Sequence, residues 1–189
     1  MQRLRTKLAV DTGAFILIAL MLLLLPLQWI SAAIFAAVIH ELFHYCSLRL
    51  LGVHVNRVEI GHSGAVMDVE PMPAYKELIC ALAGPVGGIS LLLFSRWIPR
   101  VAVCSAIQSF YNLLPVYPLD GGRAIRSLIG ILVPQNEAKI CDVIQICSLV
   151  CISIVAIFAC FWLRIGILPL LFAAGLWAKT KIHLAKRLF

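Results

Sequence analysis

The chain has 189 residues, of which 62% are hydrophobic and only 13% are charged. A soluble domain typically has about 45–50% apolar and about 25% charged residues, so this chain carries more apolar surface than a soluble fold of its length can bury. The composition predicts an integral membrane protein, and the length suits a single domain over residues 1–189. The net charge of +7 does not indicate a nucleic-acid partner, because the basic residues are dispersed and mostly flank apolar runs.

Two membrane spans are predicted before residue 52. The stretch 12–39 contains no charged residue, and it is too long for one helix, since about 20 residues cross a hydrocarbon core of about 30 Å. The Pro-Leu-Gln-Trp sequence at 26–29 is the natural turn. It divides the region into a first span at about 7–25 and a second at about 29–51, with no small-residue cleavage site that would indicate a signal peptide.

The next segment, 53–70, has a different pattern. Valine and isoleucine alternate with polar residues around a Gly-His-Ser-Gly turn, which predicts a membrane-associated β-hairpin. A third span follows at about 76–96, and its Ala-Gly-Pro-Val-Gly-Gly sequence at 83–88 allows close helix packing and a proline kink.

The second half of the chain predicts three further spans. A fourth, at about 101–131, contains Pro115 and Pro118 and is expected to break near 115–118, where protein or a water-filled cavity must satisfy the backbone. A fifth is expected at about 139–163 and a shorter sixth at about 165–180. The predicted fold class is an all-α polytopic membrane protein with about six transmembrane helices and one small β-hairpin.

The basic residues predict the orientation of these spans. With the N-terminus in the cytoplasm, all but three of the 16 lysines and arginines fall on the cytoplasmic side, the exceptions being Arg96, Arg100 and Arg164. This positive-inside bias places both termini and the hairpin in the cytoplasm. It also places residues 40–44 and Asp120 towards the same side of the membrane.

The second span contains the sequence His40-Glu41-Leu42-Phe43-His44, which has the pattern H-E-x-x-H. Histidines four residues apart lie on one face of a helix, so both imidazoles can bind one zinc ion, and Glu41 can act on water as a general base. Inside a membrane span such a polar cluster is costly unless it is paired or bound to a metal. The alternative is that the three side chains satisfy one another and neighbouring helices without a metal.

A catalytic zinc site needs a third protein ligand besides an open position for water. The best distant candidate is Asp120, which follows the broken span and lies on the predicted side of His40 and His44. The alternative role for Asp120 is to cap the N-terminus of the helix that begins after Pro118.

Two motifs together, H-E-L-F-H at 40–44 and N-L-L-P-V-Y-P-L-D-G-G-R at 112–123, carry a family resemblance. The chain resembles the site-2 protease family of intramembrane zinc metalloproteases over about residues 29–130, and most closely its compact bacterial branch, which includes the stage IV sporulation protease. The resemblance implies that His40, His44 and Asp120 bind one zinc ion and that Glu41 activates water. It also implies that Asn112 holds the scissile peptide or its oxyanion.

The resemblance further implies an endopeptidase of the bacterial cell membrane that cleaves a membrane-tethered protein, such as a pro-transcription factor or an anti-sigma factor. Regulatory membrane proteins are expected partners, and a role in sporulation would rest on analogy alone. One departure is Phe43, which stands where many relatives have glycine. A bulky ring at this position affects packing or substrate access but removes no ligand.

Two rival functions remain open from the sequence. One is a membrane metalloprotease of the prenyl-protein-processing type, which also uses H-E-x-x-H; its distant ligand is a glutamate, and the motif at 112–123 argues against it. The other is a catalytically silent membrane protein that binds zinc, or a metal carrier. The intact Glu41 argues against the silent protein, and the nearly apolar fifth and sixth spans argue against the carrier.

Overall fold

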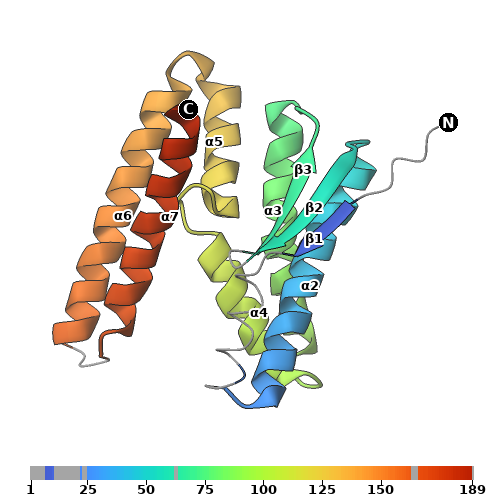
Figure 1. Cartoon of the computed structure of the whole chain (residues 1–189), viewed down its shortest axis with the longest axis vertical. Coiled ribbons are helices and arrows are strands. Elements are labelled where there is room, and N and C mark those ends of the chain that lie inside the picture. The colour runs from blue at the N-terminus through green and yellow to red at the C-terminus, as the bar shows by residue number, and fades with distance from the viewer. Residues whose placement is uncertain (1–6, 11–21, 23–24, 62–63, 163–165, 189) are drawn as a thin grey trace. The chain divides into compact units, whose positions relative to one another are not determined.

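The structure, a computed structural model, describes residues 7–10, 22, 25–61, 64–162 and 166–188. Over these ranges the chain is mostly helical and contains one small sheet (Figure 1). It forms two compact units, unit 1 (Met1–Tyr111) and unit 2 (Asn112–Phe189). In the described part, three helical segments are long and apolar enough to cross a membrane: Leu27–Leu50, Ala74–Phe94 and Pro134–Phe161.

The sheet of unit 1 has three strands in the order β1-β2-β3. The predicted hairpin is confirmed, since β2 (Val55–Gly61) and β3 (Gly64–Val69) pair in antiparallel register. The register is irregular between Val55 and Arg57. The third strand, β1 (Lys7–Val10), pairs in parallel with β2, and residue 7 lies opposite Arg57.

The prediction of a helical span from residue 7 is wrong for Lys7–Val10, because these residues form β1. A strand edge presents a row of backbone N–H and C=O groups, and β1 supplies hydrogen-bonding partners along one edge of β2. The remainder of the predicted first span, 11–25, lies almost entirely outside the described residues.

Helix α2 (Leu27–Leu50) carries its buried side chains on one stripe. Ala32, Ala36, His40, His44 and Leu48 follow one another at intervals of four residues, and all are buried. Side chains spaced by four lie above one another on a helix, so the two histidines belong to the same packed stripe as the alanines. This stripe faces α3 (Ala74–Ser90), which lies against α2.

A small apolar cluster ties the sheet to these two helices. Three side chains are buried together: Leu48 of α2, Cys80 of α3, and Val53, which lies between α2 and β2. Val55, Met67 and Val69 of the hairpin pack against them, among other partly buried side chains. The hairpin is therefore anchored next to the C-terminal end of α2, one turn beyond His44.

Helix α3 also contacts the last helix of unit 1. It continues into the short 3-10 helix η1 (Leu91–Phe94), and α4 (Pro99–Asn112) follows. The hydroxyl of Ser105 donates a hydrogen bond of 2.7 Å to the carbonyl of Gly88, and Ser105 and Ser109 are both fully buried. The absence of a side chain at Gly88 makes this close approach of α4 to α3 possible, because a Cβ atom there would collide with Ser109 Oγ.

Residues 113–119, near the start of unit 2, contain Pro115 and Pro118 and separate α4 from α5 (Asp120–Leu132). A short 3-10 helix, η2 (Pro134–Asn136), leads into α6 (Glu137–Phe161), and α7 (Leu168–Leu188) follows. Helices α6 and α7 lie side by side (Figure 1), and the indole Nε1–H of Trp177 donates to Ser153 Oγ across 3.1 Å.

The surface of α6 is strongly apolar. Only two of its residues, Leu149 and Ala156, are buried, whereas large side chains such as Val143, Ile154 and Phe158 are exposed. An apolar helix surface of this extent is typical of a helix that lies in lipid.

We expect that Gly88→Ala lowers the thermal unfolding midpoint of the detergent-solubilised protein. The added methyl group meets Ser109 Oγ, and Ser105 Oγ lies 3.1 Å away. Overpacking of this kind costs about 1–3 kcal/mol, which offsets the gain of about 0.8–1 kcal/mol in helix propensity. The matched control is Gly175→Ala in α7, where a Cβ atom meets nothing within 4 Å, and its midpoint should not fall. Equal midpoints for the two variants would contradict this packing argument.

Candidate metal centre

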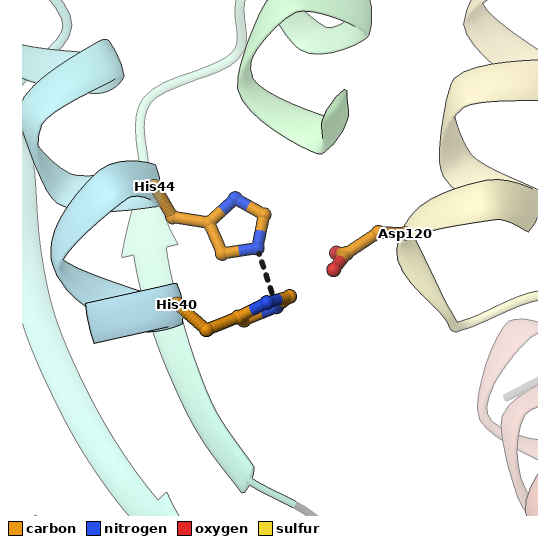
Figure 2. A group of neighbouring side chains, drawn as sticks. All are labelled: His40, His44 and Asp120. Carbon is orange, nitrogen blue, oxygen red and sulfur yellow. Dashed lines mark hydrogen bonds between the residues drawn. The ribbon is translucent and has the colours of Figure 1, made fainter. Parts of the chain in front are cut away.

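The two histidines of α2 are both buried, and their rings lie next to each other. His40 is 2% exposed and His44 is 8% exposed. Their Nε2 atoms lie 3.2 Å apart, as the dashed line in Figure 2 shows, and the ring planes are inclined at 80°. Two nitrogen ligands of one tetrahedral zinc ion, each at about 2.0–2.1 Å, are separated by about 3.3 Å. The separation in the histidine pair therefore fits zinc.

A backbone carbonyl fixes the orientation of His44. Its Nδ1 atom lies 2.7 Å from the carbonyl oxygen of Cys80 on α3. A carbonyl only accepts hydrogen bonds, so Nδ1 carries the proton and donates it. In a neutral imidazole the other nitrogen, Nε2, then holds the lone pair that a metal needs. This hydrogen bond selects the tautomer of His44 that can act as a ligand through Nε2.

The position of α3 against His44 depends on Gly84. A Cβ atom at residue 84 would overlap the imidazole ring of His44, so only glycine lets α3 approach this closely. The next residue, Pro85, is buried inside the helix and has no N–H group for the carbonyl four residues earlier. Gly84 therefore lets α3 approach His44 closely. Pro85 disturbs the same helix locally, near the Cys80 carbonyl that accepts the hydrogen bond from His44.

Phe43 is accommodated in a similar way. Its ring is 39% exposed and packs over Gly87, where an added Cβ atom would overlap it. The bulky Phe43 side chain inside H-E-x-x-H therefore fits because residue 87 on α3 is a glycine.

Glu41 is half-buried and lies one residue after His40 on α2, so its side chain points to a different side of the helix from the two histidines.

Asp120, in unit 2, is the first residue of α5 and is 7% exposed. The N-cap residue of α5 is Leu119, whose side chain makes no capping hydrogen bond, so the alternative role of Asp120 as the N-cap residue is wrong. A carboxylate in the first turn is favoured by the partial positive charge of the helix N-terminus. Its Oδ1 atom also lies 3.8 Å from Nη1 of Arg123.

The first turn of α5 packs on the segment before it. A Cβ atom at Gly121 would collide with the backbone of Leu113, and one at Gly122 would collide with the backbone at Val116 and Tyr117. Asn112, the other candidate from the second motif, is half-buried and is the last residue of α4.

His40, His44 and Asp120, all buried, are a group that could hold one metal ion (Figure 2). Two imidazole nitrogens and one carboxylate are a donor set that zinc accepts in catalytic sites.

Sequence reasoning identified the histidines but not the backbone groups that hold them. The carbonyl of Cys80 has no signature in the sequence, because every residue has one. The glycines at 84 and 87 did give a signal, since the run of small residues at 83–88 predicted a close helix contact. What the run could not indicate is that this contact is with the metal-binding motif.

Comparisons with known proteins give two curated relatives, and no protein-family profile matches the chain. A zinc metalloprotease of Methanocaldococcus jannaschii is 27% identical over 109 residues, which cover 50% of this chain and 32% of that protein. Stage IV sporulation protein FB of Bacillus subtilis is 28% identical over 149 residues, which cover 70% of this chain and 51% of that protein. The chain thus spans between a third and about half of the length of these relatives.

Among solved structures, the site-2 protease from Methanocaldococcus jannaschii has a similar fold. The TM-score is 0.66 at 18% sequence identity, and the match covers 96% of this chain and 92% of that one. The zinc metalloprotease relative and the His40, His44 and Asp120 group together support zinc as the metal.

We expect that Gly84→Ala weakens zinc binding about 10–100-fold, the range typical of losing a group that orients a ligand. The added methyl group overlaps the ring of His44, which must move away from Cys80 and from His40. Competition with a chromophoric zinc chelator measures the affinity. Gly175→Ala introduces the same methyl group into open space and should retain wild-type affinity. If both variants bind zinc equally well, Gly84 does not position His44.

Proposed function

On the premise that the chain belongs to the site-2 protease family, which both curated relatives and the structural neighbour support, we propose that it is an intramembrane zinc endopeptidase. Its substrate is a protein held in the same membrane, and the reaction is hydrolysis of a peptide bond within or at the edge of the bilayer. Water adds to the peptide carbonyl, the C–N bond breaks, and the products are a carboxylate and an amine.

The observation that carries this proposal is the buried histidine pair of α2. Both rings are withdrawn from solvent, their Nε2 atoms are separated as two ligands of one ion would be, and Cys80 sets the tautomer of His44. Burial of two imidazoles in an apolar helix is costly without a function.

His40, His44 and Asp120 would hold the zinc ion. The carboxylate of Asp120 adds a negative charge to two neutral ligands, which leaves one net positive charge on the ion. When bound, zinc acts as a Lewis acid that polarises a carbonyl group and makes water more acidic. Three protein ligands leave the fourth position open for chemistry.

Glu41 is the general base. Its carboxylate is half-buried and adjoins a metal ligand in the chain, so it can accept a proton from the attacking water and return it to the leaving amine. The role of Asn112 is to donate an amide hydrogen bond to the oxyanion that develops on the scissile carbonyl. This role comes from the position of Asn112 in the second motif.

The substrate must be extended at the cleaved bond, because a helical peptide bond is shielded by its own hydrogen bonds. The sheet of unit 1 offers a surface for an extended segment. Since β2 is central and β1 occupies one of its edges, the outer edge of β3 is paired with no strand in the described residues. Addition of a strand at such an edge supplies backbone hydrogen bonds in a sequence-tolerant way.

We further propose six membrane spans with both termini in the cytoplasm, and substrates of the kind found as membrane-tethered transcription regulators, with accessory membrane proteins controlling access. The distribution of lysine and arginine supports this orientation. It places the hairpin and the metal ligands towards the cytoplasmic side.

We expect that Glu41→Gln abolishes cleavage while zinc stays bound. The amide keeps the size of the side chain but cannot accept the proton from water, so the cleavage rate should fall by at least about 10²-fold. Co-expression with candidate membrane-tethered regulators, followed by immunoblotting for the truncated product, measures cleavage, and atomic absorption measures bound zinc. Undiminished cleavage would remove Glu41 from the mechanism.

A matched variant, Asp120→Asn, tests the ligand set. The neutral amide is a poor zinc ligand, so this variant should lose both zinc and cleavage, unlike Glu41→Gln. A wild-type protein that binds no zinc would refute the proposed function as a whole. Wild-type zinc affinity in the Asp120 variant would show that the third ligand is a different residue.

The topology yields a separate prediction. A protein that fluoresces only in the cytoplasm should be bright when it is fused after Phe189 and dark when it is fused after Arg100, which belongs to the predicted external set. Whole-cell fluorescence, normalised to the amount of each fusion by immunoblotting, gives the readout. Bright fluorescence from both fusions would contradict the proposed orientation.

A further inference from the structure

Arg126 connects three segments of unit 2. It lies on α5, and its Nε–H donates a hydrogen bond of 2.8 Å to Oε1 of Glu137 at the start of α6. Its guanidinium group also lies over the ring of Tyr117, with 5.7 Å between Cζ and the ring centroid. A planar guanidinium can bind a carboxylate in its plane and an aromatic ring on its face at the same time.

Tyr117 lies three residues before Asp120, in the segment that leads into α5. The first turn of α5 rests directly on this segment, since Gly122 has no room for a Cβ atom beside the backbone of Tyr117. The position of Tyr117 and the position of the Asp120 carboxylate are therefore coupled through about one turn of backbone. Any contact that fixes Tyr117 also restricts Asp120.

A cavity of about 30 Å³ lies between this segment and α6, lined by Pro115, Tyr117, Arg126, Cys141 and Gln145 among others. That volume has room for water but leaves the apolar contacts incomplete. The ion pair and the cation–π contact of Arg126 cross this region and link Glu137 of α6 to Tyr117.

We propose that Arg126 is a positioning residue for the metal centre: it uses Glu137 as a fixed anchor on α6 and holds Tyr117, and through Tyr117 the carboxylate of Asp120, in the orientation that zinc requires. This inference rests on the proposed function, because it assigns Arg126 a role towards Asp120 as a ligand. The side chains of Arg126 and Glu137 are 31% and 32% exposed, so solvent screens their attraction. Such a pair contributes little to global stability and more to local geometry.

Four variants test the proposal by zinc affinity. Arg126→Met removes the charge and the planar group, and zinc binding should weaken about 10–100-fold. Glu137→Gln keeps Arg126 over Tyr117 but weakens its anchor, and Arg126→Lys keeps the charge but not the planar fork; both should lie between Arg126→Met and wild type. Lys139→Gln is the matched control, because Lys139 is an exposed cation on the first turn of α6, the turn that also carries Glu137. The zinc affinity of this variant should equal that of the wild type.

A spectroscopic readout separates positioning from stability. With Co²⁺ in place of zinc, the visible absorption bands report the ligand geometry directly, and they should shift in Arg126→Met and return towards wild type in Arg126→Lys. The unfolding midpoint in detergent should stay close to wild type in all four variants. If Arg126→Met does not fold, Glu137→Gln and Arg126→Lys still provide the comparison.

The outcomes distinguish the two proposals. A wild-type protein that binds neither zinc nor Co²⁺ overturns the proposed function and this inference with it. A wild-type protein that binds zinc, together with an Arg126→Met variant of equal affinity and identical Co²⁺ spectrum, overturns the positioning role alone. The positioning role is also overturned if the loss of zinc affinity parallels a fall in the unfolding midpoint and Arg126→Lys does not restore zinc affinity, because the role of Arg126 would then be structural.

Discussion

The hydrogen bond from His44 Nδ1 to the carbonyl of Cys80 is the constraint on which the candidate metal centre depends. It joins the helix that carries the histidines to the helix packed against it, and it decides which nitrogen of His44 holds the lone pair. A side-chain acceptor would need its own rotamer to be fixed. A helix carbonyl is already held rigid by the helix, so the Cys80 carbonyl orients His44 without any further side chain having to be fixed.

That bond requires α3 to lie very close to α2, and the small residues of α3 provide the space. Gly84 lies against the ring of His44, Gly87 lies under Phe43, and Gly88 meets Ser105 and Ser109 of α4. In lipid, helices gain little from burying apolar surface, and close van der Waals contact holds them together instead. The same absence of side chains thus serves both helix association and ligand orientation in unit 1.

The features that were predictable from sequence are those set by local periodicity. His40 and His44 had to share a face because they are four apart on a helix, and 53–70 had to form a hairpin because its alternation has a period of two. The predicted helix is wrong for Lys7–Val10, because a short apolar strand and the start of an apolar helix have similar sequences, and only the distant partner strand distinguishes them. Leu119 rather than Asp120 caps α5, a difference of one residue that sequence patterns do not resolve. The roles of His40, His44 and Asp120 as ligands and the catalytic roles of Glu41 and Asn112 stay predictions.

The three-stranded sheet has a consequence for how a protease of this kind would select its targets. With β1 already on one side of β2, a substrate segment that pairs as proposed would join at the outer edge of β3, and its residues would point alternately towards and away from the body of the protein. Only every second residue of that segment would be sampled by the enzyme. Substrates would then be free to differ at the intervening positions, and the proposed enzyme would accept several membrane proteins with little overall sequence in common.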